Sequence, residues 1–272
     1  MSEDYRLQIP AINGFKANYY FCENQKIIDA HNFPPHLHDY IEIYVLIEGD
    51  VSFMVEEKVY KLSVGDVVVS RPNEVHNCIL NTASVHKHHC FWFDTNCDFL
   101  FGNLLANGNN LISPTNQDKE LLGEIYKKLK DSSEKGQTLS QFYLVLQMID
   151  VISRNAKNPI RPFNIPEVLT DILSDLNKRF VEINSLKYFT EKYCISQSTL
   201  NRLFKKYLNT SPKLYLETKR LAYSKTLLNE GKTVFQACVL SGFPDYSNYI
   251  RLFKKRLNIT PKQYQEKLKT QP

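Results

Sequence analysis

The chain has 272 residues, 43% of them hydrophobic, and a formal net charge of +5. This length accommodates two domains, and no apolar run approaches the roughly 18 residues that a membrane span needs, so we expect no membrane partner. The N-terminal segment MSEDYRLQIP lacks the basic and apolar regions of a signal peptide, and the six cysteines form no C-x-x-C pair. These features predict a cytoplasmic protein with reduced thiols.

Charge is distributed unevenly along the chain. Residues 1–166 hold 15 Lys+Arg and 20 Asp+Glu, a net charge of −5, whereas residues 167–272 hold 19 and 9, a net charge of +10. A strongly basic, helix-rich segment is typical of proteins that bind phosphate groups. All seven histidines instead lie in the first ninety residues. Any imidazole chemistry therefore belongs to the N-terminal part.

Short β-rich runs follow one another from Ile27 to Phe93, with turn residues about every ten positions. This pattern predicts a sandwich or a barrel. An extended segment beginning at His36 would alternate its side chains between two faces. One face would carry His36, His38, Glu42 and Tyr44, and the other Ile41, Ile43, Val45 and Ile47. The alternation favours a polar interior and an outer face that packs against another element.

The periodicity then changes to that of helices. Apolar residues three and four positions apart predict helices over 118–130 and 139–155. The second is apolar around much of its circumference, so it needs more than one neighbour. These neighbours could belong to a dimer partner or to the barrel, and both explanations of the apolar surface stay open. Three prolines in residues 157–166 then predict an interdomain linker.

The C-terminal part reads as entirely helical. We expect helices over 166–180, 185–193, 196–208, 211–230, 233–241, 245–257 and 260–268. The predicted N-terminal caps are Ser185, Ser196, Ser211, Thr233, Asp245 and Thr260. Gly231 and Gly242 are placed to end the helices that precede them.

A duplicated segment lies within this helical part. RLFKKYLNTSPKLY (Arg202–Tyr215) returns 49 residues later as RLFKKRLNITPKQY (Arg251–Tyr264), with ten of fourteen positions identical. Each copy begins within the second helix of a helix, a short turn and a helix, the arrangement that places a recognition helix in the major groove of DNA. The predicted base-reading residues are Gln197, Ser198, Asn201, Arg202, Tyr246, Ser247, Asn248 and Arg251. The predicted phosphate contacts are Lys205, Lys206, Lys254, Lys255 and Arg256.

The stretch LSGFPDYSNYIRLFKKRLNITPKQY closely resembles the signature of the AraC/XylS family of bacterial transcription factors. The matching positions are Gly242, Phe243, Tyr249, Arg251, Phe253, Lys254, Thr260, Pro261 and Tyr264. The resemblance covers residues 165–268 and implies two helix-turn-helix units bridged by a long helix at 211–230. The two recognition helices would enter successive major grooves. Asn209 and Asn258 stand where the family usually has Gly, which Asn can replace because it tolerates the left-handed conformation.

The segment His36–Gly49 resembles the first cupin motif, and Gly65–His76 resembles the second in a modified form. His36, His38, Glu42 and His76 could bind a divalent metal, but the second motif departs from the metal-enzyme pattern. We therefore expect no metal and no cofactor. Instead, these four residues and Tyr44 are predicted to line an effector pocket. In the later run Val85–Phe93, alternation places His86 and His88 opposite His89.

The sequence thus predicts an α+β protein: an N-terminal cupin-like β-barrel (double-stranded β-helix) with a helical appendage, then an all-α domain with two helix-turn-helix units. The expected boundaries are a sensing barrel at 1–112, a helical dimerisation or packing segment at 113–156, a linker at 157–166 and a DNA-binding domain at 167–272. Such a protein would be a regulator, not an enzyme, and more often an activator.

The predicted partners are promoter DNA, a small-molecule effector such as a sugar, a second copy of the chain and, for an activator, RNA polymerase. Two alternatives stay open. One is a metal-dependent cupin enzyme fused to a DNA-binding domain, and the other is a constitutive DNA binder with a purely structural barrel.

Overall fold

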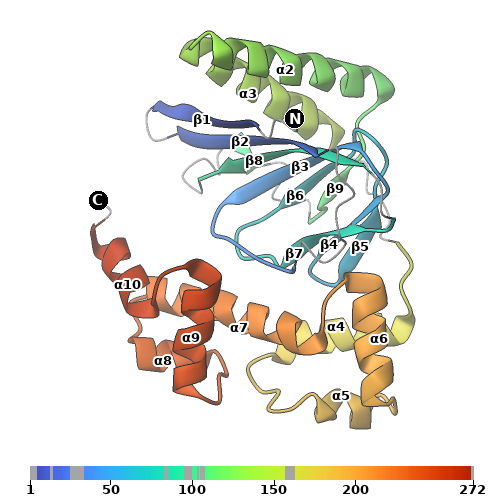
Figure 1. The fold of residues 1–272 in the computed structure, drawn as a ribbon, viewed down its shortest axis with the longest axis vertical. Helices are drawn as coiled ribbons and strands as arrows, with labels where there is room; N and C mark the ends of the chain where they lie inside the picture. The colour runs from blue at the N-terminus through green and yellow to red at the C-terminus, as the bar shows by residue number, and fades with distance from the viewer. Residues whose placement is uncertain are drawn as a thin grey trace. The chain divides into compact units, whose positions relative to one another are not determined.

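The computed structural model describes residues 5–12, 15–24, 34–82, 85–94, 100–102, 104, 108–156 and 163–270 (Figure 1). The chain divides into two compact units. The first includes His38–Asn164, and the second comprises Ile165–Pro272 with the short segment Pro34–Leu37. His31 and most of the predicted linker 157–166 lie outside the described residues. None of the described helices combines the length and the apolar character that crossing a bilayer requires.

The part of the first unit that the structure describes, called the sheet unit below, contains two antiparallel sheets. The six-stranded sheet has the order β1 (Tyr5–Ile12), β2 (Phe15–Asn24), β8 (His86–Phe93), β3 (Ile41–Glu48), β6 (Val67–Ser70) and β9 (Leu111–Ile112). The three-stranded sheet has the order β5 (Lys58–Lys61), β4 (Val51–Val55) and β7 (His76–Leu80). No strand pairing joins the two sheets within the described residues, so they form an open two-sheet arrangement and not a closed barrel.

The two faces of strand β3 point into different cores, as its alternation predicts. Ile41, Ile43 and Val45 belong to the core that the six-stranded sheet shares with two helices. Tyr44 and Leu46 belong to a second core that also contains side chains of the three-stranded sheet. The polar residues of the alternating pattern therefore lie on the face between the sheets. This placement confirms the predicted separation of polar and aliphatic faces.

Helices α2 (Asn116–Glu134) and α3 (Thr138–Asn155) lie side by side over the six-stranded sheet (Figure 1). Both bury an apolar stripe in the shared core. Their ends are tied together because Asp118 accepts hydrogen bonds from Arg154 and from the Asn155 amide. The guanidinium of Arg154 lowers the pKa of Asp118 below its usual value. Both helices were predicted, and packing on the sheet accounts for much of the apolar surface of α3.

In the described residues of the second unit, called the helical unit below, seven helices match the predicted ones within two residues at each end. They are α4 (Glu167–Arg179), α5 (Lys187–Lys192), α6 (Gln197–Leu208), α7 (Pro212–Asn229), α8 (Val234–Leu240), α9 (Tyr246–Leu257) and α10 (Pro261–Thr270). The side chains of Ser196, Ser211, Thr233 and Asp245 cap their helices as predicted. Thr260 accepts a hydrogen bond from the Gln263 amide.

Helix α7 is the central element of the helical unit, and it is buried around most of its surface. Its buried Arg220 donates hydrogen bonds to the carbonyl oxygens of Phe180 and Ile183, which follow α4. Both carbonyls lie beyond the last residue of α4 and have no partner within that helix, so the guanidinium satisfies them. At the other end of α7, the ammonium of Lys225 lies 5.8 Å from the ring centre of Tyr264 in α10. Helix α7 thereby contacts both the segment that follows α4 and helix α10.

Candidate functional site

The helical unit contains two helix-turn-helix units with the same internal design. In the first, α5 packs against α6, and in the second, α8 packs against α9. Leu200 and Phe204 of α6 are fully buried, as are Tyr249 and Phe253 at the corresponding positions of α9. Burial of these residues fixes which side of each second helix faces solvent. The opposite side is the one available to DNA.

The predicted base-reading residues lie on these exposed sides. Those of α6 are all exposed, and so are those of α9 except Asn248, which is half-buried. Within α6, the Gln197 amide donates to Asn201 Oδ1 at 3.3 Å. Within α9, Arg251 Nη2 donates to Asn248 Oδ1 at 2.9 Å. Both bonds link side chains of one helix on its solvent side, while their role in reading bases stays a prediction.

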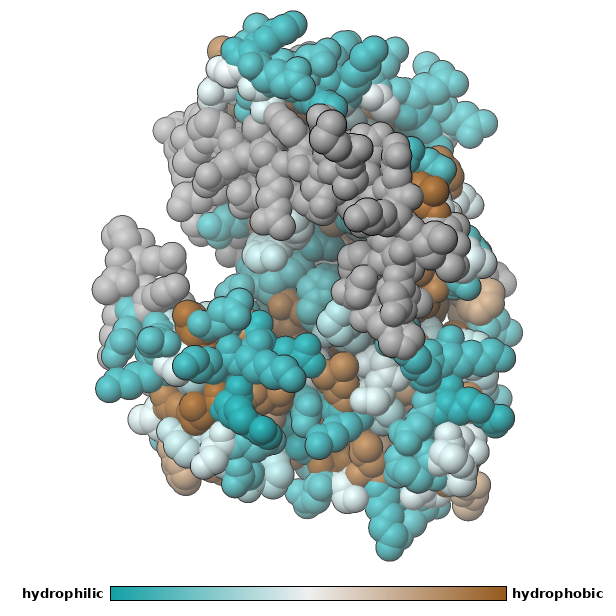
Figure 2. Space-filling model, viewed as in Figure 1, coloured by the Kyte–Doolittle hydropathy of each residue, from teal (hydrophilic) through white to brown (hydrophobic). Residues whose placement is uncertain are grey.

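The predicted phosphate contacts are exposed as well. This group consists of Lys205 and Lys206 near the end of α6, and of Lys254, Lys255 and Arg256 near the end of α9. Figure 2 shows that the visible face of the helical unit is largely hydrophilic, with separate hydrophobic patches. Exposed cations beside a recognition helix are suited to contacts with the DNA backbone.

One cation beside α9 was not among the predicted contacts. A surface pocket of about 390 Å³ lies between the start of α7 and α9, and Lys213 lines it together with Arg251, Lys255 and Arg256. Glu217 also lines this pocket, so it is not purely basic. The position of Lys213 directly after the first residue of α7 was visible in the sequence, but its approach to α9 depends on how the two helices pack.

The same aromatic contact closes each helix-turn-helix unit. Phe204 meets Tyr215 edge-to-face at 6.1 Å between ring centres, and Phe253 meets Tyr264 at 5.8 Å. All four residues belong to the duplicated segment. The sequence repeat is therefore a repeat of tertiary structure.

The predicted effector-pocket residues of the sheet unit gather on the face between the sheets. His38, Glu42, Tyr44 and His76 are buried. His38 Nε2 lies 3.1 Å from Glu42 Oε2, and His76 Nε2 lies 3.7 Å from Glu42 Oε1. His36 is exposed and lies outside the sheet unit, in the short segment Pro34–Leu37 that belongs to the second unit.

Tyr44 points instead toward a second polar group that the predicted site did not include. Its hydroxyl oxygen lies 2.7 Å from His86 Nε2, and the rings of His86 and His88 stack with 4.6 Å between centres. Burial lowers the pKa of His86 to about 4 and that of His88 to about 3, so both are neutral near pH 7. Alternation along Val85–Phe93 separates these two residues from His89, but it does not show that they meet Tyr44.

His89 lies on the other face of β8, as that alternation predicts. Its ring packs 4.3 Å from that of Tyr126 on α2, between the sheet and the helices. Burial lowers the pKa of His89 to about 3. This histidine is therefore part of the packing between β8 and α2, away from the polar groups between the sheets.

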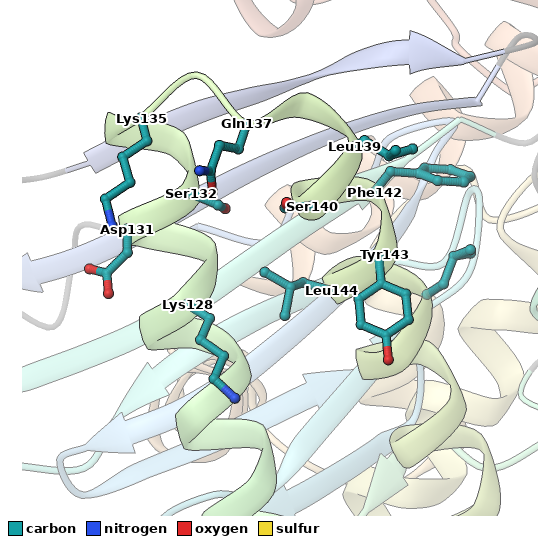
Figure 3. Close-up of a pocket in the computed structure, with 11 residues that line it drawn as sticks. Lys128, Asp131, Ser132, Lys135, Gln137, Leu139, Ser140, Phe142, Tyr143 and Leu144 are labelled. Atoms are coloured by element: carbon teal, nitrogen blue, oxygen red, sulfur yellow. The ribbon is translucent and has the colours of Figure 1, made fainter.

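A groove on the outer side of α2 and α3 is the third feature of functional interest. Its volume is about 740 Å³, and it is lined by side chains of both helices (Figure 3). Leu139 is 76% exposed and Tyr143 is 63% exposed along it. Half-buried Phe142 and Leu146 continue the apolar surface, which Lys128 and Asp131 border. Packing on the sheet thus leaves part of α3 uncovered.

Comparisons with known proteins agree with this geometry. Residues 21–139 match the model of the AraC-like ligand binding domain, and residues 189–267 match that of a helix-turn-helix domain. An uncharacterised helix-turn-helix regulator, YbfI of Bacillus subtilis (strain 168), is 24% identical over 79% of this chain and 81% of its own length. The transcriptional activator RhaR of Mannheimia succiniciproducens is 23% identical over 80% of this chain and 81% of its own length.

Among solved structures, that of ToxT from Vibrio cholerae O395 is 13% identical, with a TM-score of 0.38, and the match covers 94% of this chain and 99% of that one. Two helix-turn-helix units behind a ligand-binding sheet domain define a DNA-binding transcriptional regulator. The chain belongs to the AraC/XylS family, as its C-terminal motifs predict.

Proposed function

We propose that the protein is a sequence-specific transcriptional activator whose sheet unit binds a small-molecule effector. The observation that carries the proposal is the duplicated recognition helix, with Arg202 and Arg251 exposed at matching positions. Arginine is suited to paired hydrogen bonds with guanine in the major groove. Two such helices in one unit explain why the sequence repeats, since duplex DNA presents successive grooves.

Full-length protein tests this proposal by selection of bound duplexes from a random DNA pool, followed by binding measurements on the selected sequence. We expect one extended site whose two halves are read by α6 and α9. Arg202→Ala should relax the preference in one half and Arg251→Ala in the other.

Lys127→Ala is the matched control, because it removes an exposed positive charge from the sheet unit and leaves both recognition helices intact. Recovery of no preferred sequence, or of a site that neither arginine variant alters, would contradict the proposal.

The effector proposal depends on the polar residues between the two sheets. The buried imidazoles, Glu42 and Tyr44 offer both donors and acceptors to a polyhydroxylated ligand, so sugars are the first candidates. Promoter footprinting with and without each candidate sugar measures the effect. Tyr44→Phe should weaken the response without changing DNA binding in the absence of sugar. A footprint that no candidate alters, in a protein that still activates transcription, favours the constitutive alternative.

The relatives RhaR and RhaS carry the description of transcriptional activators, and this supports activation as the sign of regulation. An activator would bring RNA polymerase to the promoter. A reporter gene behind the selected site tests this point: activity that falls when the regulator is deleted supports activation, and activity that rises indicates repression.

A homodimer is the remaining part of the proposal. The apolar groove of α2 and α3 would be covered by the same surface of a second copy, an isologous contact. Leu139→Glu with Tyr143→Glu should convert the dimer to a monomer in sedimentation measurements. A monomeric wild-type protein would overturn this part alone.

A further inference from the structure

We infer that the basic pocket between α7 and α9 binds one nucleotide of the DNA backbone, and that Lys213 contacts its phosphate. The pocket has a volume of about 390 Å³ and lies wholly within the helical unit. The start of α7 forms one wall and α9 forms the other. This role rests on the proposed function, because it requires that both recognition helices meet DNA. It adds a contact and a place on the duplex that base reading does not supply.

The pocket carries an excess of positive charge. Lys213 from α7 and three cations from α9 line it, against the single carboxylate of Glu217. Lys213 Nζ lies 3.9 Å from Glu217 Oε1 and the Lys213 side chain is 76% exposed, so this ion pair is weak. In the part of the chain that the structure describes, no carboxylate forms an ion pair with Arg251, Lys255 or Arg256. Four cations and one carboxylate leave a net charge of +3 for an anion from outside.

An apolar part of the lining indicates which anion fits. Half-buried Leu214 and Leu252 line the pocket together with the cations. The volume falls within the range of about 300–1,000 Å³ that is typical of small-ligand sites, so the pocket is larger than a bare phosphate ion requires. Cations beside aliphatic side chains suit a phosphate that is attached to a deoxyribose ring, because the ring carbons are apolar. A nucleotide of the DNA backbone has this chemistry.

The place of the pocket in the fold favours DNA as the source of the phosphate. Helix α7 runs between the two helix-turn-helix units, and three residues separate its start from the end of α6 (Figure 1). One wall of the pocket therefore follows directly on the first recognition helix, and the other wall is the second. Arg251, a predicted base-reading residue, also lines the pocket. Helices in successive major grooves have a minor groove and its two bordering strands between them, so the pocket is placed to receive one of these strands.

A nucleotide held there would position the duplex without reading its sequence, because phosphate contacts carry no base information. Lys213 would exchange its weak pair with Glu217 for a phosphate oxygen. The spacing between the two recognition helices is fixed by α7, so a contact at the start of α7 would set the register of both helices on the backbone. Loss of Lys213 should therefore weaken binding to every duplex by a similar factor.

The sequence repeat supplies a matched control. Lys262 stands in the second copy where Lys213 stands in the first, directly after the proline that begins the helix. Both lysines are exposed, but Lys213 lines the pocket and Lys262 does not. Comparison of Lys213→Ala with Lys262→Ala thus separates the effect of the pocket from that of the repeated motif.

The test uses full-length protein and copies of the selected duplex in which one backbone phosphate at a time is replaced by a neutral methylphosphonate. In the wild type, we expect one or two neighbouring phosphates between the half-sites at which the replacement weakens binding about three- to fivefold. Lys213→Ala should weaken binding to the unmodified duplex by about the same factor and lower the salt slope by about one. At the sensitive phosphates Lys213→Ala should show no further loss, since both changes remove the same contact. Lys213→Arg keeps the charge and should bind as the wild type does.

Equal losses in Lys213→Ala and Lys262→Ala would overturn the inference, and so would the lack of any phosphate whose replacement fails to add to Lys213→Ala. Binding of inorganic phosphate to the DNA-free protein through Lys213, with no DNA phosphate depending on that lysine, would assign the pocket to a small phosphorylated ligand and overturn it as well. If selection recovers no preferred duplex, the proposed function fails, but the salt slopes of Lys213→Ala and Lys262→Ala on random DNA still decide the role of the pocket, since a phosphate contact does not depend on sequence.

Discussion

The two helix-turn-helix units share a framework but differ at the positions that would meet DNA. Ser196 and Asp245 cap the second helix in each, and Asn209 and Asn258 end it in the left-handed conformation. On the exposed sides, however, Gln197 of the first unit corresponds to Tyr246 of the second. Exposed Asn201 corresponds to Ile250, which is half-buried and packs against the apolar core. The framework is constrained by folding, whereas the reading surface is free to diverge.

This divergence suggests two kinds of reading. The first unit presents amide groups, which hydrogen-bond to base edges, and the second presents the exposed aromatic ring of Tyr246, which suits thymine methyl groups. The second unit also has Arg256 where the first has Tyr207, whose ring lies 5.0 Å from the Lys206 ammonium. Helix α9 therefore carries one cation more than α6.

The turns of the two units differ as well. Cys194 turns the first unit with a φ of 50°, at an exposed position. Gly242 turns the second with a φ of 82°, and a Cβ added there would lie 2.4 Å from the carbonyl oxygen of Val181. Close approach to backbone, and not the turn alone, makes glycine necessary in the second unit.

The largest expected effect follows from this difference. Gly242→Ala should destabilise the helical unit by about 2–4 kcal/mol, because it adds both backbone strain and a contact with Val181. Cys194→Ala leaves the first turn unstrained relative to the wild type and should cost less than about 1 kcal/mol. Urea denaturation followed by circular dichroism at the helical band measures both. Equal losses would show that the two turns are equivalent.

The next effect concerns base reading. Arg202→Ala and Arg251→Ala should each weaken binding to the selected duplex by about 1–3 kcal/mol while largely sparing nonspecific DNA. Titrations on the selected duplex and on a scrambled one give the two affinities. An arginine whose loss weakens every duplex equally would be a phosphate contact, and the symmetry between the units would be lost.

A smaller effect should separate the basic ends of α6 and α9. Lys255→Ala should lower the slope of log affinity against log salt concentration by about one. Lys206→Ala should lower it less, since the Tyr207 ring holds the Lys206 ammonium near α6. Binding measured at several salt concentrations gives the slopes. A larger change for Lys206 would place the stronger backbone contact in the first unit.

The smallest effect is expected at the left-handed helix ends. Glycine adopts this conformation without steric cost, so Asn258→Gly should stabilise the helical unit by about 0.5 kcal/mol. The gain should be smaller for Asn209→Gly, because Asn209 Oδ1 accepts a hydrogen bond from Lys205 Nζ at 3.0 Å. The urea midpoints of the two variants measure the difference. Destabilisation by Asn258→Gly would show that the side chain of Asn258 makes a stabilising contact that outweighs the steric gain from glycine.

Local chemistry alone predicted much of the helical unit. A capping side chain such as Thr233 or Asp245 bonds to an amide three residues away, and a glycine such as Gly231 ends a helix through its own φ. Alternation along His36–Gly49 likewise predicted which residues face the space between the sheets, because successive side chains of a strand point to opposite faces. These signals lie within a few residues of the elements they specify.

Contacts between distant segments needed the tertiary structure. The approach of His86 to Tyr44 depends on the pairing of β3 with β8, and the approach of Gly242 to Val181 depends on packing against the residues after α4. Contacts between distant segments also decide that the strands form two open sheets and that one side of α3 stays uncovered. The sequence by itself determined the family, the helices and the faces of the strands, since these follow from short-range chemistry. Which buried groups meet was decided only by the packing of whole elements against one another.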